Sequence, residues 1–308
     1  MTTPSTAAPP APPSGTLPTA LPRSGPPARG RGRRRRRGRV VANTLAVLFC
    51  AVWIFPVYWM VNTALKPRSE VLSATPRFWP SAPTPDNFVT AVTQSGFLQN
   101  LLNSVIVVGA TLVVAVVLGI FAAAAVSRFR FRGRRAIMVV ILAVQMLPAT
   151  ALLIPMFVVF NAAGLLGSYV ALVLAYVATV LPFSIWVMRG FFVAIPVEVE
   201  EAAKIDGASS WRILVSILFP LVAPGVIATS IFAFIAAWND YLFAYTFMQD
   251  QSRYTLPVWL ASFSNPNTGT DFGGQMAASL LFSLPVVVFF LLIQRNLVSG
   301  MSAGAVKG

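Results

Sequence analysis

Long uncharged apolar stretches alternate with short polar segments along almost the whole chain. The first stretch runs from residue 40 to residue 65 without a charged side chain. At 1.5 Å per helical residue, this exceeds the roughly 30 Å hydrocarbon thickness of a bilayer. The interval between Arg135 and Arg189 is also uncharged and is longer than two bilayer crossings, so it is predicted to hold two spans. Polar and glycine residues at 161–168 mark the turn between them. The pattern predicts six transmembrane helices, at about residues 40–65, 103–126, 136–160, 169–189, 213–239 and 275–294.

The composition is typical of a membrane protein with several spans. Hydrophobic residues make up 56% of the 308 residues and charged residues 10%, and the mean hydropathy is +0.74. These values lie outside the usual range of soluble domains. The sequence therefore predicts an all-α polytopic fold over residues 39–308. A Pro-, Ala- and Arg-rich tail at residues 1–38 is predicted to be disordered. No cleavable signal peptide is predicted, because the apolar stretch after the tail is too long.

Basic residues cluster directly beside predicted spans. An arginine run at residues 31–39 precedes the first span, and a mixed basic and aromatic run at residues 127–135 follows the second. Either run could bind nucleic acid. Basic side chains next to a span are, however, typical of the cytoplasmic face and of contact with anionic lipid, so no nucleic-acid partner is predicted. With the arginine run inside, both chain termini are predicted to be cytoplasmic. Only four basic residues then lie outside, namely Lys66, Arg68, Arg77 and Arg253.

One charged, helix-prone segment at residues 196–225 interrupts the apolar second half. Pro196 suits the first position of a helix, and the carboxylates that follow it favour the positive end of the helix dipole. Gly207 offers a stop, because glycine commonly adopts the left-handed conformation after a helix end. Ser209 or Ser210 can then cap a second helix. The segment is predicted to form a bent pair of helices at the cytoplasmic surface.

The same segment resembles the EAA signature of ABC-importer permeases. The match is carried at the family spacing by Glu201, Ala202, Ala203, Gly207, Ile217 and Pro220. The strings EEAAKIDGASSW and FPLVAPG are similar to the maltose-type carbohydrate permeases of the second-subunit branch, although Phe219 stands where a leucine is usual. Residues 85–88, residues 103–104 and the glycine-bearing C-terminal tail are similar to the same family. Taken alone, the segment could also be an ordinary amphipathic loop.

The resemblance implies a type I ABC-importer permease of the bacterial cell membrane, forming one half of a pathway for a sugar or oligosaccharide. It also implies three kinds of partner: a second permease subunit, two copies of an ABC ATPase subunit and an extracytoplasmic solute-binding protein. In this family the EAA loop docks into a cleft of the ATPase. Carried over to this chain, the ATPase-coupling residues are Glu200, Glu201, Ala202, Ala203, Asp206, Gly207 and Ala208.

The sequence offers no residues for catalysis of its own. It has no Walker-type phosphate-binding loop and no histidine. ATP hydrolysis is therefore expected on a separate subunit, and no cofactor, metal or catalytic residue is predicted. Polar residues in or beside the spans are candidates for the solute pathway, although each can equally satisfy helix backbone or a neighbouring span. These candidates are Gln145, Asn161, Asn239 and Asp240.

Two other classes of protein compete with this interpretation. An ion-coupled secondary transporter is also polytopic with proline-interrupted helices. No predicted span, however, carries a buried charged residue that could couple an ion, and Asp240 stands at a span end. A membrane-anchored nucleic-acid-binding or regulatory protein would leave the remaining spans and the EAA spacing unexplained. The importer permease is therefore the predicted function.

Overall fold

The computed structural model describes most of the chain, namely residues 31–93, 96–265 and 269–302. The chain divides into two units, residues 1–55 and residues 56–308, and each is described by itself. The described part of the first unit is helical and belongs to helix α1 (Arg31–Ala64), which continues into the second unit. The functional features below all lie in the second unit.

Helix α1 begins earlier than the sequence predicts. Residues 1–30 of the predicted tail lie outside the described residues, but α1 includes the whole arginine run. Residues 31–38, which the sequence places in a disordered tail, are helical in the structure. Arginine is a good helix former and extends an apolar helix at its N-terminal end without breaking it. The part of α1 that is apolar enough to cross a membrane is Arg39–Ala64, which agrees with the first predicted span.

The predicted all-α fold is confirmed. In the described part of the second unit, four further helical runs are long and apolar enough to cross a membrane. One of them is continuous from Ser210 to Trp238 and consists of α9, a π-helical turn η2 and α10. The elements of these four runs are α4 (Phe97–Arg128), α7 (Tyr169–Ala194), α9 (Ser210–Ile213), η2 (Leu214–Leu218), α10 (Phe219–Trp238) and α13 (Phe272–Ser302).

The third predicted span is broken. Instead of one helix over residues 136–160, the structure has α5 (Arg134–Gln145) and then η1 with α6, at an angle of 99°. The break falls at Pro148, whose backbone is extended at φ −62° and ψ 130°. Proline cannot donate a helix hydrogen bond and disfavours helical backbone in the residue before it. The chain thus has six spans only if this bent pair counts as one. The two later elements are η1 (Ala149–Leu152) and α6 (Leu153–Ala162).

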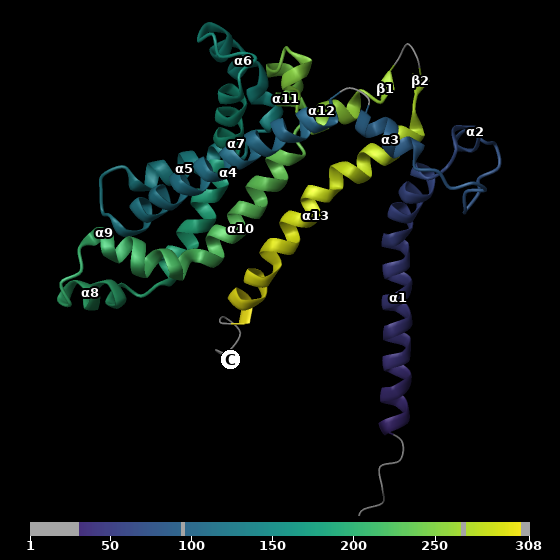
Figure 1. The fold of residues 1–308 in the computed structure, drawn as a ribbon. Helices are drawn as coiled ribbons and strands as arrows, with labels where there is room; N and C mark the ends of the chain where they lie inside the picture. The colour runs from purple at the N-terminus through teal and green to yellow at the C-terminus, as the bar shows by residue number, and fades with distance from the viewer. Residues whose placement is uncertain (1–30, 94–95, 266–268, 303–308) are drawn as a thin grey trace, which may run out of the picture. The chain divides into compact units, whose positions relative to one another are not determined.

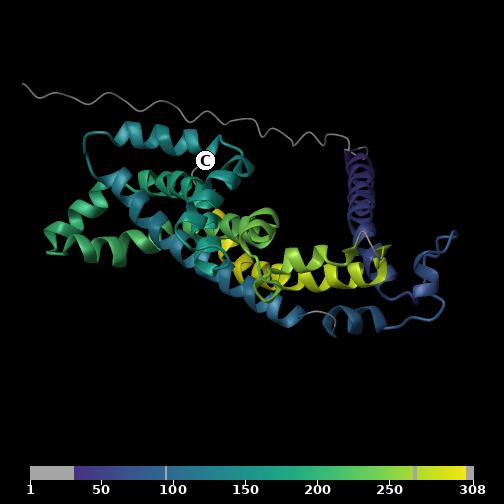
Figure 2. The same ribbon diagram turned by 90° about the horizontal axis from the view of Figure 1, so that it is seen from above.

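The long helices of the second unit pack around α4. Helix α4 lies along α7 and α10, and α10 also packs against α13 (Figures 1 and 2). Apart from the main core of the long helices, a smaller apolar cluster joins the C-terminal ends of α4 and α7 to helix α8 (Val197–Ile205), α9 and the start of α10. Both figures show α8 and α9 together at the end of the helix group where α4 ends. The buried side chains of this cluster include Ile120, Met188, Phe192, Ala203 and Val222.

The two segments that join long helices, residues 65–96 and residues 239–271, contain short elements. Among these, β1 and β2 pair as an antiparallel hairpin. Helix α3 packs against α13 and α12 packs against α4, so both segments are held to the long helices. The short elements are α2 (Arg68–Val71), α3 (Asp86–Thr93), α11 (Leu242–Phe247), η3 (Gln251–Arg253), α12 (Leu256–Ala261), β1 (Ser264–Asn265) and β2 (Gly269–Thr270).

Two polar residues of α4 anchor the segment that contains α12. The side-chain amide of Asn103 donates to the carbonyl oxygens of Ser252 and Tyr254, at 2.9 Å each. The Ser104 hydroxyl accepts from the backbone N–H of Leu256 at 2.7 Å. Asn103 and Ser104 are buried, and buried polar groups are kept only when they are hydrogen-bonded. These two residues, which form part of the family resemblance, therefore have a structural role in this fold.

Helices α7 and α10 approach closely at Gly225. A methyl group added there would lie 2.5 Å from Cδ2 of Phe191. We therefore expect Gly225→Ala to destabilise the fold by about 1–3 kcal/mol through overpacking. Gly190→Ala on α7 is the matched control, because an added methyl group there meets nothing within 4 Å. Thermal unfolding in detergent measures the difference, and equal unfolding temperatures for the two variants would contradict the prediction.

Candidate functional site

Helix α8 and its flanking turns form a short segment that is stabilised largely by its own caps and turn hydrogen bonds. Pro196 occupies the cap position one residue before the helix, and Glu198 and Glu200 lie in its first turn. Lys204 lies in the last turn, so charges of both signs complement the helix dipole. After the turn, the Ser209 hydroxyl accepts from the backbone N–H of Arg212 at 3.3 Å and caps α9. The predicted pair of helices is therefore present.

The end of α8 is a Schellman motif built on Gly207. This residue has φ +79°, in the left-handed region that favours glycine. Its N–H donates to the carbonyl of Lys204 at 3.0 Å, and the N–H of Ala208 donates to the carbonyl of Ala203 at 2.9 Å. Ala208 also packs against the apolar cluster that contains buried Ala203. The backbone of the turn is thus fixed by its own hydrogen bonds.

An ion pair ties α8 to the end of α4. Nε of Arg128, the last residue of α4, lies 2.5 Å from Oε1 of Glu200. A second nitrogen of the same guanidinium donates to the carbonyl of Ile195 at 3.2 Å. The two charged side chains are only 14% and 12% exposed. Charges buried to this degree need a partner, so each holds the other in place.

The outer face of α8 is exposed in the described chain. Four of its exposed side chains are charged, and the exposed apolar ones are Val197, Val199, Ala202 and Ile205. Ile205 is 87% exposed, beside the Gly207 turn. A large apolar side chain displayed among charges is a common feature of protein-binding surfaces. We call this exposed set the α8 outer face, and it consists of Glu198, Glu201, Ala202, Lys204, Ile205 and Asp206.

The residues expected to couple to an ATPase divide into two groups. Those that face outward with the turn are Glu201, Ala202, Asp206 and Gly207. Glu200 and Ala203 point inward instead, the first to Arg128 and the second into the apolar cluster, and Ala208 is half-buried. The inward group positions the helix, while the outward group is available to a partner.

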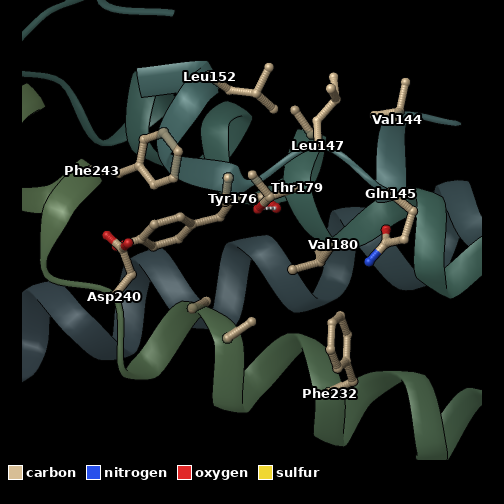
Figure 3. Close-up of a pocket in the computed structure, with 14 residues that line it drawn as sticks. Val144, Gln145, Leu147, Leu152, Tyr176, Thr179, Val180, Phe232, Asp240 and Phe243 are labelled. Atoms are coloured by element: carbon tan, nitrogen blue, oxygen red, sulfur yellow. Dashed lines mark hydrogen bonds between the residues drawn. The ribbon is translucent and has the colours of Figure 1, made fainter. Parts of the chain in front are cut away.

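A pocket lies where the broken span meets α7 and α10 (Figure 3). Its volume is about 290 Å³, near the lower end of the roughly 300–1,000 Å³ of small-molecule sites. Figure 3 shows Asp240 and Tyr176 on one side of the pocket and Gln145 on the other, with Phe232 along α10. Most of the lining is apolar. The lining comprises Val144, Gln145, Leu147, Ala149, Leu152, Tyr176, Ala178, Thr179, Val180, Phe232, Ala236, Ala237, Asp240 and Phe243.

Asp240 is held by its neighbours. Its Oδ2 accepts from the Tyr176 hydroxyl at 2.8 Å and from the backbone N–H of Ala244 at 3.1 Å. Burial raises the pKa of the Asp240 carboxyl, and the hydrogen bonds from Tyr176 and from the backbone of Ala244 and Phe243 act in the opposite direction. The carboxyl therefore sits at a fixed position in a largely apolar pocket.

Two of the four pathway candidates share this pocket. Gln145 and Asp240 both line it, although 95 residues separate them in the sequence. Asn161 and Asn239 are exposed and do not line it. The Asn239 side chain donates to the carbonyl of Ile235 in its own helix at 2.8 Å, which is the backbone-satisfying role considered as the alternative.

Several residues of both sites escape sequence reasoning. Arg128 looks like one more basic residue at a span end, and nothing in the sequence pairs it with Glu200. Tyr176 and Thr179 lie inside a uniformly apolar span and give no signal until the fold brings them beside Asp240. Ile205 could have been noticed, because it interrupts a charged segment. Among the described residues, no group of three or more His, Cys, Asp or Glu side chains is placed to hold a metal ion.

The architecture defines the class of protein first. The fold has helices long enough to cross a membrane and a broken span that lines a pocket. It also has a short, capped helix, α8, with an exposed face. These features fit a multi-pass transport subunit. The sequence profile of the family described as "binding-protein-dependent transport system inner membrane component" matches residues 115–303, and the chain belongs to this family. It is a membrane-spanning permease subunit of an ABC importer, and the interpretation as an ion-coupled secondary transporter is set aside.

Curated relatives match over nearly their whole length. The diacetylchitobiose uptake system permease protein DasC of Streptomyces coelicolor is 39% identical over 88% of this chain and 98% of its own. The trehalose transport system permease protein SugB of Mycobacterium tuberculosis is 36% identical, with 90% and 100% covered. The trehalose/maltose permease protein MalG of Thermococcus litoralis is 35% identical, with 85% and 95% covered.

A solved structure supports the fold. One chain of a bacterial ABC transporter involved in the import of the acidic polysaccharide alginate aligns with a TM-score of 0.74. The alignment covers 85% of this chain and 97% of that chain, at 21% sequence identity. At this identity the likeness concerns the fold alone, and it agrees with the type I importer architecture expected from the sequence.

Proposed function

We propose that this chain forms half of the translocation pathway of a heteromeric sugar importer, together with a different permease subunit. Its relatives, whose names specify diacetylchitobiose, trehalose or maltose, support a neutral sugar or oligosaccharide as the solute. The full-length match to these relatives is the observation that carries the proposal. Selection of the individual sugar would fall to a separate extracytoplasmic solute-binding protein. A related structure, the alginate transporter bound to a sugar-loaded periplasmic protein, supports a partner of this kind.

The α8 outer face is proposed to dock into one ATPase subunit. The second permease subunit would engage the other ATPase copy in the same way. The mixed charges of the α8 outer face and the exposed Ile205 support a complementary cleft with an apolar floor. ATP hydrolysis is assigned to that partner. The proposal requires α8 to be cytoplasmic, which the distribution of basic residues supports, and both chain termini would then be cytoplasmic.

The test is import of sugar by the complete system. We expect proteoliposomes containing this chain, its partner permease and the ATPase to import labelled disaccharide when ATP and the cognate binding protein are supplied. Ligand screening of that binding protein would use trehalose, maltose and diacetylchitobiose beside a peptide and a metal ion. A binding protein that takes the peptide or the metal and no sugar would overturn the proposed function.

A further inference from the structure

The pocket beside Asp240 contains the irregular backbone of the broken span. Residues 144–152, which cross the break at Pro148, supply five of its lining residues. Backbone outside a regular helix is tolerated at membrane depth only where it is buried in protein or lines a cavity. In transport proteins, interrupted spans commonly contribute to solute sites for this reason. A solute site in this pocket would therefore explain why the span is broken at this position.

The polar groups of the pocket come from three different parts of the chain. Asp240 follows α10, Thr179 lies on α7, and Gln145 ends α5. The carboxylate can accept hydrogen bonds and the amide can donate and accept. The Thr179 hydroxyl donates to the carbonyl of Tyr176 at 2.9 Å and can still accept a hydrogen bond. The aromatic rings of Phe232 and Phe243 complete the lining with apolar faces. A few convergent polar groups in a mainly apolar pocket are typical of a small-molecule site.

From this arrangement we infer that the pocket is a saccharide-recognition site within the membrane domain, and that it accepts neutral sugars while rejecting acidic ones. The inference rests on the proposed function and extends it to particular residues. A sugar ring presents hydroxyl groups at its edge and C–H groups on its faces. Its hydroxyls would donate to Asp240 and pair with Gln145 and Thr179, while a C–H face would pack on an aromatic ring. The pocket volume of about 290 Å³ suits one sugar ring at a time.

The charges of the lining residues determine whether the pocket favours neutral or acidic sugars. Asp240 carries the single carboxyl group among the fourteen lining residues, and none of these residues is Lys or Arg. A carboxylate on the solute would face Asp240 without a basic group to neutralise it. In a pocket of low polarity, that arrangement disfavours an acidic solute strongly. The solved transporter of similar fold is described as an importer of the acidic polysaccharide alginate, a class of solute that this pocket would disfavour.

Direct sugar binding to the purified complex, without the binding protein, tests the inference. Saturation-transfer NMR detects weak contacts, and the probes are trehalose, maltose, diacetylchitobiose and the acidic disaccharide digalacturonic acid. We expect contact with at least one neutral disaccharide and none with the acidic one. Asp240→Asn and Thr179→Val should each weaken neutral-sugar binding about tenfold, which corresponds to the loss of one hydrogen bond in a buried site.

Matched controls separate a solute contact from a structural role. Thr229→Val on α10 removes a buried hydroxyl that donates to Gly225 in its own helix and does not line the pocket. It should bind sugar like the parent. Because Asp240 also fixes the start of α11 through Ala244, Thr179→Val provides a second variant that leaves that bond intact.

Three results would overturn the inference. They are no neutral-sugar contact in the parent complex, equal binding in all three variants, or binding of digalacturonic acid as strong as that of the neutral sugars. Each can occur while the complete system still imports sugar, and only the pocket assignment then fails. Import of a different kind of solute would instead remove the proposed function itself.

Discussion

Replacing Gly207 with valine is expected to leave the protein inserted in the membrane and to uncouple it from ATP hydrolysis. The left-handed backbone at φ +79° costs a residue with a side chain about 1–2 kcal/mol, and a β-branched side chain is the least tolerant of it. The Schellman bonds to Lys204 and Ala203 would then weaken, and the α8 outer face would turn away from its docking position. We expect binding-protein-stimulated ATP hydrolysis by the reconstituted complex to fall by about tenfold or more.

Gly207→Asn is the informative control for this prediction. Asparagine tolerates the left-handed conformation better than other residues with side chains, and a Cβ atom at this position meets nothing within 4 Å. The asparagine variant should therefore retain most of the stimulated hydrolysis. If Gly207→Val assembled and hydrolysed ATP like the parent, α8 would not be the coupling element.

Breaking the ion pair between Arg128 and Glu200 is expected to have a comparable effect through a different route. Either Arg128→Gln or Glu200→Gln leaves the opposite charge buried without its partner, and such losses commonly cost about 3–5 kcal/mol. Helix α8 would then lose its charged connection to the end of α4 and keep only the apolar contacts of Ala203. We expect both variants to hydrolyse ATP with poor stimulation by the binding protein and to import less sugar for each ATP consumed.

The double variant makes this prediction specific to the pair. Arg128→Gln together with Glu200→Gln removes both charges and should recover part of the lost coupling, so the two single effects would not add. Arg130→Gln, which removes an exposed basic residue two positions away, should behave like the parent. Additive losses in the double variant would show that the two side chains act independently.

The sequence predicted the spans well because their signal is local. A run of uncharged apolar residues long enough to cross a bilayer determines a helix almost by itself. The broken third span shows the limit of that signal. Pro148 indicates a weak point, but a proline can kink a helix gently or break it, and the choice depends on what packs against it. Here the break opens onto α7 and α10, which no local pattern reveals.

The parts of the candidate sites that depend on residues close together in the sequence could be predicted, and the parts that depend on distant residues could not. The turn at Gly207 and the cap at Ser209 follow from short-range hydrogen bonding, so the residues themselves indicate them. The partners of Glu200 and Asp240 are different, because Arg128 lies 72 positions earlier in the chain and Tyr176 lies 64 positions earlier. Such pairs arise from the packing of α4, α7 and α10. Residues such as Asp240 could thus be selected as candidates, while their surroundings could not.

Residues 196–212 are stabilised largely by hydrogen bonds within the segment, which makes the proposed ATPase contact a separable part of the molecule. Its turn bonds and caps are internal, and Arg128 connects it by an ion pair to α4, which packs against α7 and α10. A segment of this kind can be exchanged between related permeases without rebuilding the pocket, provided that Arg128 and the apolar cluster around Ala203 are kept. The preference for an ATPase subunit and the preference for a solute can therefore change separately during evolution. Chimeric transporters can be assembled by joining two permeases at the ends of this segment.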